Sequence, residues 1–308
     1  MTSEERYWWR IVLELKLRKS NGDAFQEFFS ALMAKLHGED FVRVRPFGSL
    51  GDKGCDGYLQ SCGQVFQCYG ALNGDSARVQ YLIAKMGTDY NSAAEKLAML
   101  MKEWHMVHNL VEGLPIQAIE KLEELRKADT GRKFGFIGIE GFEKRIFSLA
   151  PEHIQDLLGM AASTANALNM QVAELRALVA AVSSEADYSP GDIPIKPVPC
   201  DKLEFNKLPN HWRHLISGGW QNAYIVAKYL DDHTDPLTGE RIAQVFRVRY
   251  EYLKAQGLAS GAVMSGLYEM VTGIGIVPPE RQVAAQALLA FLFESCDIFE
   301  DEPAKVVQ

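Results

Sequence analysis

Residues 51–70, GDKGCDGYLQSCGQVFQCYG, combine acidic, amide and thiol side chains within one short segment. The pattern predicts two short strands joined by a glycine-containing turn near Ser61–Gly63. Such a hairpin places Asp56 almost opposite Gln67 on the neighbouring strand. Carboxylate, amide and backbone carbonyl oxygens are hard ligands that suit Mg²⁺, which retains several waters and also binds phosphate oxygens. An ion bound there could polarise a phosphodiester and generate hydroxide from water.

A redox or zinc site is the main alternative for this segment, because three of the chain's five cysteines lie in it. The five are Cys55, Cys62, Cys68, Cys200 and Cys296. They are odd in number and form no CxxC pair, so we expect free thiols in a reducing compartment. A structural zinc site would need four ligands at tighter spacing. Asp56 and Gln67 are therefore the residues of interest, and Glu27 on a preceding helix could supply another carboxylate.

The elements around this segment indicate an α/β domain. Apolar periodicity and turn residues predict the order α-α-β-β-β-α-β-α-β, with mixed strand directions. The longest helix should be interrupted or bent near Gly87. The expected helices are 4–19, 24–38, 76–103 and 115–129, and the expected strands are 41–48, 56–60, 64–70, 103–110 and 133–139.

The second half of the chain is expected to be helical on both sides of a proline-rich break. Residues 151–182 predict two further helices. Five prolines follow within residues 183–209, a composition that resists helix and sheet and is typical of a linker. We therefore expect a first domain over 1–182, a linker over 183–209 and a smaller all-α domain over 210–308, which would dock onto partners.

The composition is that of an ordinary globular protein. Apolar residues make up 47% and charged residues 23% of the chain, which excludes wholesale disorder. The sequence has no apolar run of about 18 residues that could span a membrane. The first residues, MTSEERYWWR, do not read as a signal peptide. We expect a cytoplasmic protein without membrane contact.

The net charge of −8 argues against a protein that coats nucleic acid through overall attraction. Residues 1–150 hold 20 Lys and Arg against 20 Asp and Glu, whereas residues 151–308 hold 12 against 20. Any DNA contact is therefore expected in the first half, at a local site whose binding depends on salt.

The hairpin and the helix before it resemble the PD-(D/E)XK restriction-endonuclease superfamily. The closest branch has a helical Glu, then GD-x-G-x-DG, then Gln-x-Lys; here these correspond to Glu27, GDKGCDG at 51–57 and Gln67-Cys68-Tyr69. The resemblance implies a restriction-endonuclease-like mixed sheet flanked by helices. It also implies Mg²⁺ or Mn²⁺ held by Glu27, Asp56, Gln67 and the backbone carbonyl of Cys68.

One position departs from the family pattern. The family's lysine, which orients or activates the attacking water, should stand where this chain has Tyr69. Some members supply that lysine from the following helix, where Lys85 is the candidate, and Tyr69 could instead position a phosphate through its hydroxyl. Two interpretations stay open: a Mg²⁺-dependent endodeoxyribonuclease assisted by Lys85, or a catalytically degenerate DNA-binding or scaffold subunit. A nuclease acting on RNA is a third, weaker option.

A wider resemblance covers about two thirds of the chain, the extent of a domain-sized unit on each side of the linker. Residues 25–115 resemble the N-terminal nuclease domain of ABC-three-component anti-phage systems, which are related to Lamassu, and residues 200–301 resemble the accompanying C-terminal helical domain. The resemblance implies an endonuclease of double-stranded DNA that works with an SMC-like ABC ATPase and a small middle subunit. These partners would restrain cutting until foreign DNA is sensed, and a homo-oligomer is compatible with this arrangement.

Three other polar or aromatic groups are expected to be structural. His105 and His108 fall on opposite faces of one predicted strand, so they should not share a metal. The acidic stretch 231–235 precedes a helix, where capping explains such residues better than metal binding. Trp8 and Trp9 lie on a helix face near the start of the chain, where aromatic side chains more often pack a core than stack on bases.

Overall fold

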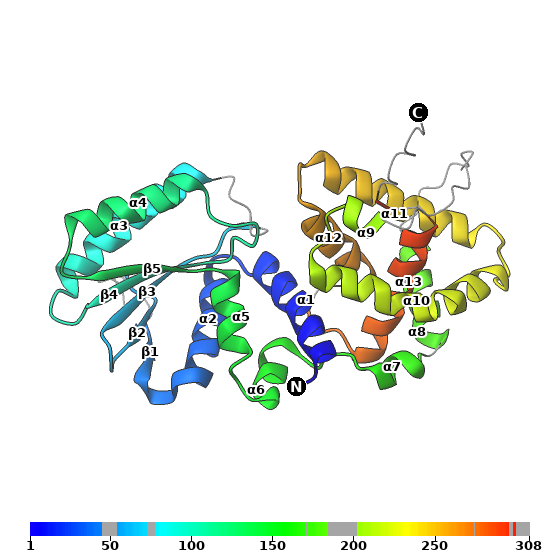
Figure 1. Cartoon of the computed structure of the whole chain (residues 1–308), viewed down its shortest axis with the longest axis horizontal. Coiled ribbons are helices and arrows are strands. Elements are labelled where there is room, and N and C mark those ends of the chain that lie inside the picture. Colours follow the sequence, from blue (N-terminus) through cyan, green and yellow to red (C-terminus); the bar gives the residue numbers. More distant parts are fainter. Residues whose placement is uncertain are drawn as a thin grey trace. The chain divides into compact units, whose positions relative to one another are not determined.

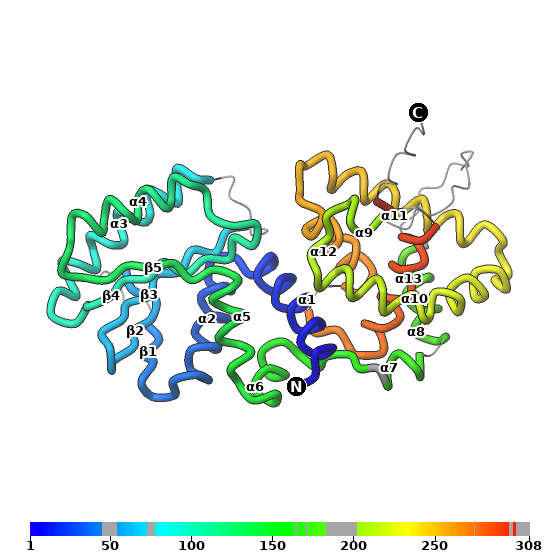
Figure 2. Tube along the Cα trace, viewed as in Figure 1, coloured from blue at the N-terminus to red at the C-terminus, as the bar shows by residue number. Residues whose placement is uncertain are grey.

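The computed structural model describes residues 1–44, 54–72, 78–170, 172–183, 202–273, 275–295 and 298–299. Contacts divide the chain into two compact units. The sheet unit is Leu13–Leu158, and the helical unit combines Met1–Val12 with Gly159–Gln308. Helix α1 (Ser3–Lys19) contributes residues to both units. Figures 1 and 2 colour the elements of each unit along the chain.

The sheet unit contains the predicted order of helices and strands, so the α/β class with mixed strand directions is confirmed. After α1 come α2 (Gly22–His37), a 3-10 turn (Gly38–Asp40), β1 (Phe41–Arg43), β2 (Gly57–Leu59), β3 (Gln64–Tyr69), α3 (Val79–Lys96), β4 (Glu103–His108), α4 (Ile116–Ala128), β5 (Lys133–Ile137), α5 (Ile139–Ile146) and α6 (Pro151–Leu158). The predicted interruption near Gly87 is wrong, because α3 runs through it. Helix α5 was not predicted. Residues 45–53, which include the start of the GDKG turn, lie outside the described residues.

The five strands form one mixed sheet in the order β1-β2-β3-β4-β5. β1, β2 and β3 pair antiparallel, which confirms the predicted hairpin. β4 and β5 run parallel to β3. The carboxyl ends of β3, β4 and β5 therefore lie at one edge of the sheet (Figure 1), where loops and helix ends can gather functional side chains.

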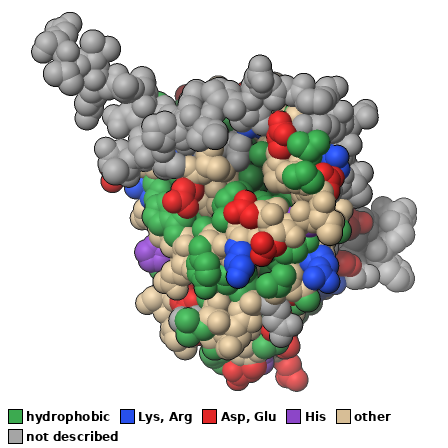
Figure 3. Space-filling model, turned by 90° about the vertical axis from the view of Figure 1, so that its right-hand side faces the viewer, with side chains coloured by type: hydrophobic (Ala, Val, Ile, Leu, Met, Phe, Trp, Pro, Cys, Tyr) green, Lys and Arg blue, Asp and Glu red, His purple; other side chains and the backbone are tan. Residues whose placement is uncertain are grey.

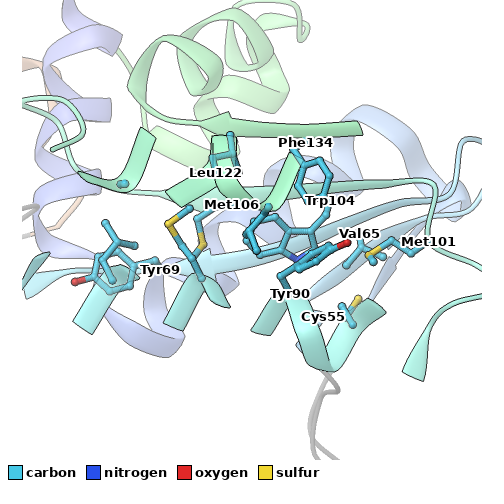
Figure 4. Close-up of a cluster of buried hydrophobic side chains, with 14 of the residues drawn as sticks. Cys55, Val65, Tyr69, Tyr90, Met101, Trp104, Met106, Leu122 and Phe134 are labelled. Carbon is cyan, nitrogen blue, oxygen red and sulfur yellow. The ribbon is translucent and has the colours of Figure 1, made fainter. Parts of the chain in front are cut away.

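Helices α3 and α4 cover one face of the sheet. Val65, Trp104 and Phe134 from three adjacent strands pack with side chains of both helices in a cluster of buried residues (Figure 4). Tyr90 of α3 contacts two of these rings, at centroid distances of 5.8 Å to Trp104 and 5.1 Å to Phe134. This layer fixes α3, and with it Lys85, against the sheet.

Helices α2 and α5 cover the opposite face. Phe66 follows Val65 in β3 and so points to the other side of the sheet. It packs against Phe29 of α2 at a ring distance of 5.3 Å, and Phe142 of α5 lies against both Phe28 and Phe29. Alternation along β3 thus anchors a helix on each face, and α2 carries Glu27.

The helical unit is built around α13. Its described helices beyond α1 are α7 (Thr164–Leu168), α8 (Val172–Ser183), α9 (Lys202–Phe205), α10 (Asn210–Asp231), α11 (Thr238–Ala255), α12 (Ser260–Thr272) and α13 (Pro279–Glu294). α13 is apolar around most of its circumference, as expected of a central helix. Gly219 of α10 lets the two backbones approach closely, since a Cβ there would stand 2.4 Å from the carbonyl oxygen of Gln286.

The predicted domain boundaries, 1–182, 183–209 and 210–308, differ from this grouping by contacts. Helix α8 packs on α13 and α11 of the helical unit, although it had been assigned to the first domain. α9 forms within the predicted linker, most of which lies outside the described residues. The helical unit, with Gly159–Gln308, is also not smaller than the sheet unit. Among the described residues, no helix combines the length and the apolar character needed to cross a membrane.

Candidate active site

One pocket of the sheet unit, about 530 Å³ in volume, is lined by all six residues predicted for the metal-binding and catalytic site. It opens where the first turns of α2 meet β1, the start of β2, the end of β3 and α3. Its predicted members are Glu27, Asp56, Gln67, Cys68, Tyr69 and Lys85. Its other lining residues are Gly22, Asp23, Gln26, Arg43, Gly70 and Tyr81. Five separate stretches of chain therefore converge on one site.

Asp56 stands at a β-bulge. The strand register places Gly57 opposite Phe66, and the backbone amide of Asp56 also donates to the Phe66 carbonyl at 2.8 Å. Two consecutive residues thus face one residue of β3, an arrangement that re-aims side chains and is common beside active sites. Cys55, just before the bulge, packs in the α3 layer (Figure 4). The bulge shifts the expected direct opposition of Asp56 and Gln67 and turns the carboxylate toward α2.

The carboxylate of Asp56 is buried and held from two sides. It is 6% exposed. Oδ1 accepts from Nε2 of Gln26 at 2.8 Å, and Oδ2 accepts from the backbone amide of Cys68 at 2.7 Å. Gln26 was not among the predicted site residues, although it directly precedes Glu27 on the same helix.

Gln67 supplies the observation that best fits a metal. Its side chain is 2% exposed, yet among the described residues its Oε1 has no hydrogen-bond partner. A buried acceptor left without a donor is costly, and such groups in native structures call for a ligand, a water or an ion. An amide oxygen beside a carboxylate is a ligand set for Mg²⁺ or Mn²⁺.

Glu27 is placed differently from Asp56 and Gln67. Its side chain is 59% exposed, and Oε1 forms an ion pair with Nη2 of Arg43 at 3.2 Å. Arg43 is the last residue of β1 and was not among the predicted site residues. Its signal in the sequence is weak, since one basic residue at a strand end has many ordinary explanations.

Lys85 reaches the pocket from α3, while Tyr69 belongs to the core. Nζ of Lys85 pairs with Oδ2 of Asp89 at 2.6 Å. Burial alone would lower the pKa of Lys85, but the hydrogen bond to Asp89 and the charges of Asp89 and Asp56 outweigh it and raise that pKa. The ammonium therefore stays charged. Tyr69 is buried in the α3 layer (Figure 4), with its ring 6.3 Å from that of Tyr81.

Asn109, which the sequence analysis missed, ties the site's backbone together. Its Nδ2 donates to the carbonyls of Leu17, Ser20 and Ala71, and its Oδ1 accepts from the Ala71 amide. The nearby Gly70 carbonyl accepts from the Gly22 amide at 3.1 Å. These bonds fix the end of β3 against the start of α2, which sets the carboxylates of α2 relative to Gln67.

Comparison with known proteins identifies part of the helical unit. Residues 173–300 match C-terminal domain 10 of the ABC-three component (ABC-3C) systems. This match supports membership of the chain in such a defence system, whose components form complexes of several subunits. No curated protein and no solved structure matches the chain. The match covers α8 to α13 and no residue of the pocket.

The other polar and aromatic groups have structural environments. His108 is buried, and its pKa falls to about 4 because of that burial. His233 and Asp235 bond within the loop before α11, with the Asp235 amide donating to Nδ1 of His233 at 3.1 Å. Trp8 and Trp9 are buried, and Trp9 donates to the Gly159 carbonyl at 3.0 Å. These observations agree with the structural interpretations.

Metal binding by other clusters finds no support in the part of the chain that is described. There, no group of three or more His, Cys, Asp or Glu side chains is arranged to hold a metal ion. Cys55, Cys62 and Cys68 are free thiols, and burial together with the charge of Asp56 raises the pKa of Cys68, which keeps it unreactive. The candidate set in the pocket has two carboxylates and would be completed by Gln67 and a backbone carbonyl.

Proposed function

We propose that this chain is a metal-dependent DNA endonuclease and the effector subunit of an ABC-three component anti-phage complex. The observation that carries the proposal is the convergence of Asp56, Gln67, Glu27 and Lys85 on one pocket, with a buried Gln67 oxygen that accepts from no donor among the described residues. The pattern was expected from a resemblance to PD-(D/E)XK nucleases, and the mixed sheet is compatible with a restriction-endonuclease-like fold.

The residues divide into metal ligands and a charge that meets the substrate. Asp56, Gln67 and the Cys68 carbonyl would hold Mg²⁺ or Mn²⁺, and Glu27 would complete the set. The bound ion would polarise the phosphodiester and lower the pKa of a water. Because Lys85 stays protonated, it would orient that water or stabilise the phosphate's developing charge rather than act as a base. The attacking water would release a proton to solvent as its oxygen bonds to phosphorus. The bond between phosphorus and the leaving sugar oxygen would break, and the sugar oxygen would take up a proton from solvent.

The helical unit would supply the connection to partners. The match to an ABC-3C C-terminal domain favours docking by this unit, with an ABC ATPase of the SMC-like type and a small middle subunit as the expected partners. On the face shown in Figure 3, hydrophobic side chains lie among acidic and basic ones. Exposed Trp220 and Tyr224, one turn apart on α10, are the kind of aromatic anchors that interfaces use.

Cleavage of supercoiled plasmid in Mg²⁺ tests the proposal. The protein is assayed alone and with its ATPase and middle subunit, as wild type, as Asp56→Asn, and as the control Asp156→Asn, an exposed aspartate of the same unit paired with Lys35. Wild type and Asp156→Asn should cut, whereas Asp56→Asn should lose at least about 10²-fold, since metal coordination contributes several kcal/mol to the transition state. Equal cutting by all three proteins, or none by any in the assembled complex, would contradict the proposal.

A catalytically degenerate DNA-binding or scaffold subunit is the second candidate. Tyr69 favours it, since a buried aromatic ring occupies the position of the family's lysine. Phage protection separates the two. A scaffold would keep protection in the Asp56→Asn variant while its complex still assembles, whereas the nuclease would lose protection with assembly intact.

A further inference from the structure

The proposed metal ligands differ in burial: two are enclosed by the protein, and the third is largely exposed to solvent. Asp56 and Gln67 are 6% and 2% exposed and are set by the strand pairing of β2 and β3. Glu27 instead projects from α2, with 59% of its side chain exposed, and its carboxylate pairs with Arg43. The positive guanidinium repels a cation and competes with it for the charge of this carboxylate, so Glu27 is a weaker metal ligand while Arg43 is paired with it.

Two cations line the pocket among its described residues, and their partners differ. Lys85 pairs with Asp89 four residues along the same helix, so its partner lies outside the pocket lining. Arg43, on an edge strand, pairs with a candidate metal ligand. The Glu27–Arg43 pair is largely solvent-exposed, and such pairs shift an equilibrium by only about two- to five-fold. It is therefore easily exchanged for a better partner.

We propose that Arg43 is a substrate-dependent gate on the metal site, an inference that rests on the proposed nuclease function. Without DNA, the guanidinium holds Glu27 and weakens metal binding. A phosphodiester of bound DNA takes the guanidinium, whose planar fork matches phosphate oxygens, and Glu27 is released to the metal. Metal and DNA then strengthen each other's binding by the same factor, as linkage requires. The site is completed only when substrate is present.

The test measures Mn²⁺ binding to the full-length chain by electron paramagnetic resonance, with and without a short phosphorothioate DNA duplex that resists hydrolysis. Without DNA, Arg43→Gln should bind Mn²⁺ about two- to five-fold more tightly than wild type. That gain should vanish when Glu27→Gln is already present, because the two side chains act as a pair. DNA should tighten Mn²⁺ binding by wild type and have a smaller effect on Arg43→Gln.

Lys85→Gln is the matched control, because it removes a cation from the same pocket without touching the Glu27 pair. General electrostatics would give Lys85→Gln and Arg43→Gln the same gain, and would leave the gain of Arg43→Gln intact beside Glu27→Gln. Either result overturns the gate. If wild type binds Mn²⁺ through Asp56 and Arg43→Gln changes nothing, the gate fails while the nuclease proposal stands. No Mn²⁺ binding by wild type even with DNA would overturn both.

Discussion

Two buried glutamines, one in each unit, show how differently the two parts of this chain use polar groups. Gln282 of α13 is 1% exposed and fully bonded: its Nε2 donates to Met160 and Val277, and its Oε1 accepts from the Ala162 amide. Gln67 of β3 is 2% exposed and leaves Oε1 without a partner in the described structure. One glutamine bonds three backbone groups, and the other buries an oxygen that has no partner among the described residues.

The same contrast appears in the comparison with known proteins. The family match spans residues 173–300 of the helical unit and includes no residue of the pocket, and no curated protein or solved structure matches the chain. A metal pocket depends on a few side chains that many scaffolds can present. Membership in a defence system therefore rests on one unit, and the proposed chemistry rests on the geometry of the other.

Replacing each glutamine by leucine tests whether Gln282 stabilises the fold and Gln67 binds a ligand. Gln282→Leu should lower the free energy of unfolding by about 2 kcal/mol, because it leaves the buried Ala162 amide and the part-buried Met160 and Val277 carbonyls without this partner. Gln67→Leu should change it by less than about 1 kcal/mol, since it removes an unpaired oxygen, yet it should abolish tight Mn²⁺ binding. Urea unfolding and Mn²⁺ titration measure the two effects. Equal destabilisation by both variants would show that Gln67 is a structural residue.

Lys85→Met probes the charge beside the metal ligands. Loss of this ammonium should reduce plasmid cleavage by about 10²-fold, the usual effect of removing one donor that stabilises transition-state charge. Lys121→Met is the control, because Lys121 on α4 is exposed to a similar degree and pairs with Glu124 of its own helix. If both variants cut like wild type, Lys85 does not replace the family's lysine. That result would favour the interpretation of a catalytically degenerate site.

Much of this arrangement could be read from the sequence, for identifiable reasons. Strong periodicity in 4–19 and 115–129 and the Gly-containing turn of the hairpin predicted the elements of the sheet unit, and the PD-(D/E)XK pattern predicted which residues would meet. The bulge at Asp56 could not be predicted, because it is defined by a backbone hydrogen bond from the Asp56 amide to the Phe66 carbonyl, which side-chain types do not specify. Asn109 and Arg43 were missed for a related reason: their partners lie far away in the sequence.

Local sequence preferences also suggested two features that differ from the described structure. Gly87 suggested a break, but α3 continues because its buried residues, such as Leu82 and Met86, hold it to the sheet. Proline and glycine around 183–209 suggested a linker up to residue 209, whereas Lys202 is 1% exposed and donates to the Phe293 carbonyl at 2.9 Å. Tertiary packing overrides local preference in both cases.

Acid should destabilise the sheet unit more than the helical unit, because His108 lies in the sheet unit. Burial lowers the pKa of this histidine from 6.5 to about 4. Between these two pH values, His108 is mostly protonated in the unfolded chain and mostly neutral in the folded chain. Stability is therefore lost as the pH falls from 6.5 toward 4, by about 2 kcal/mol at pH 5. Hydrogen exchange should show the amides of β4 opening with acid before those of α13.

His108→Asn supplies the control for this pH effect. An asparagine oxygen can accept from the Leu110 amide, which donates to Nδ1 of His108 at 3.3 Å, and it does not titrate in this range. The variant should lose most of the difference between pH 7 and pH 5 in the sheet unit. An unchanged acid response would mean that other groups carry it, for instance His105, whose pKa burial also lowers.

The smallest expected effect belongs to Tyr69→Phe, and it decides between the two substitutes for the missing lysine. The Tyr69 ring packs among core residues of the α3 layer, so phenylalanine preserves that packing and removes only the hydroxyl. If Lys85 provides the charge, cleavage by Tyr69→Phe should fall by less than about five-fold, the worth of one neutral hydrogen bond. If the Tyr69 hydroxyl positions the phosphate instead, this variant should lose about as much as Lys85→Met was expected to lose, and Lys85→Met should lose little. The ratio of the cleavage rates of Tyr69→Phe and Lys85→Met therefore shows whether Tyr69 on β3 or Lys85 on α3 takes the role of the family's lysine.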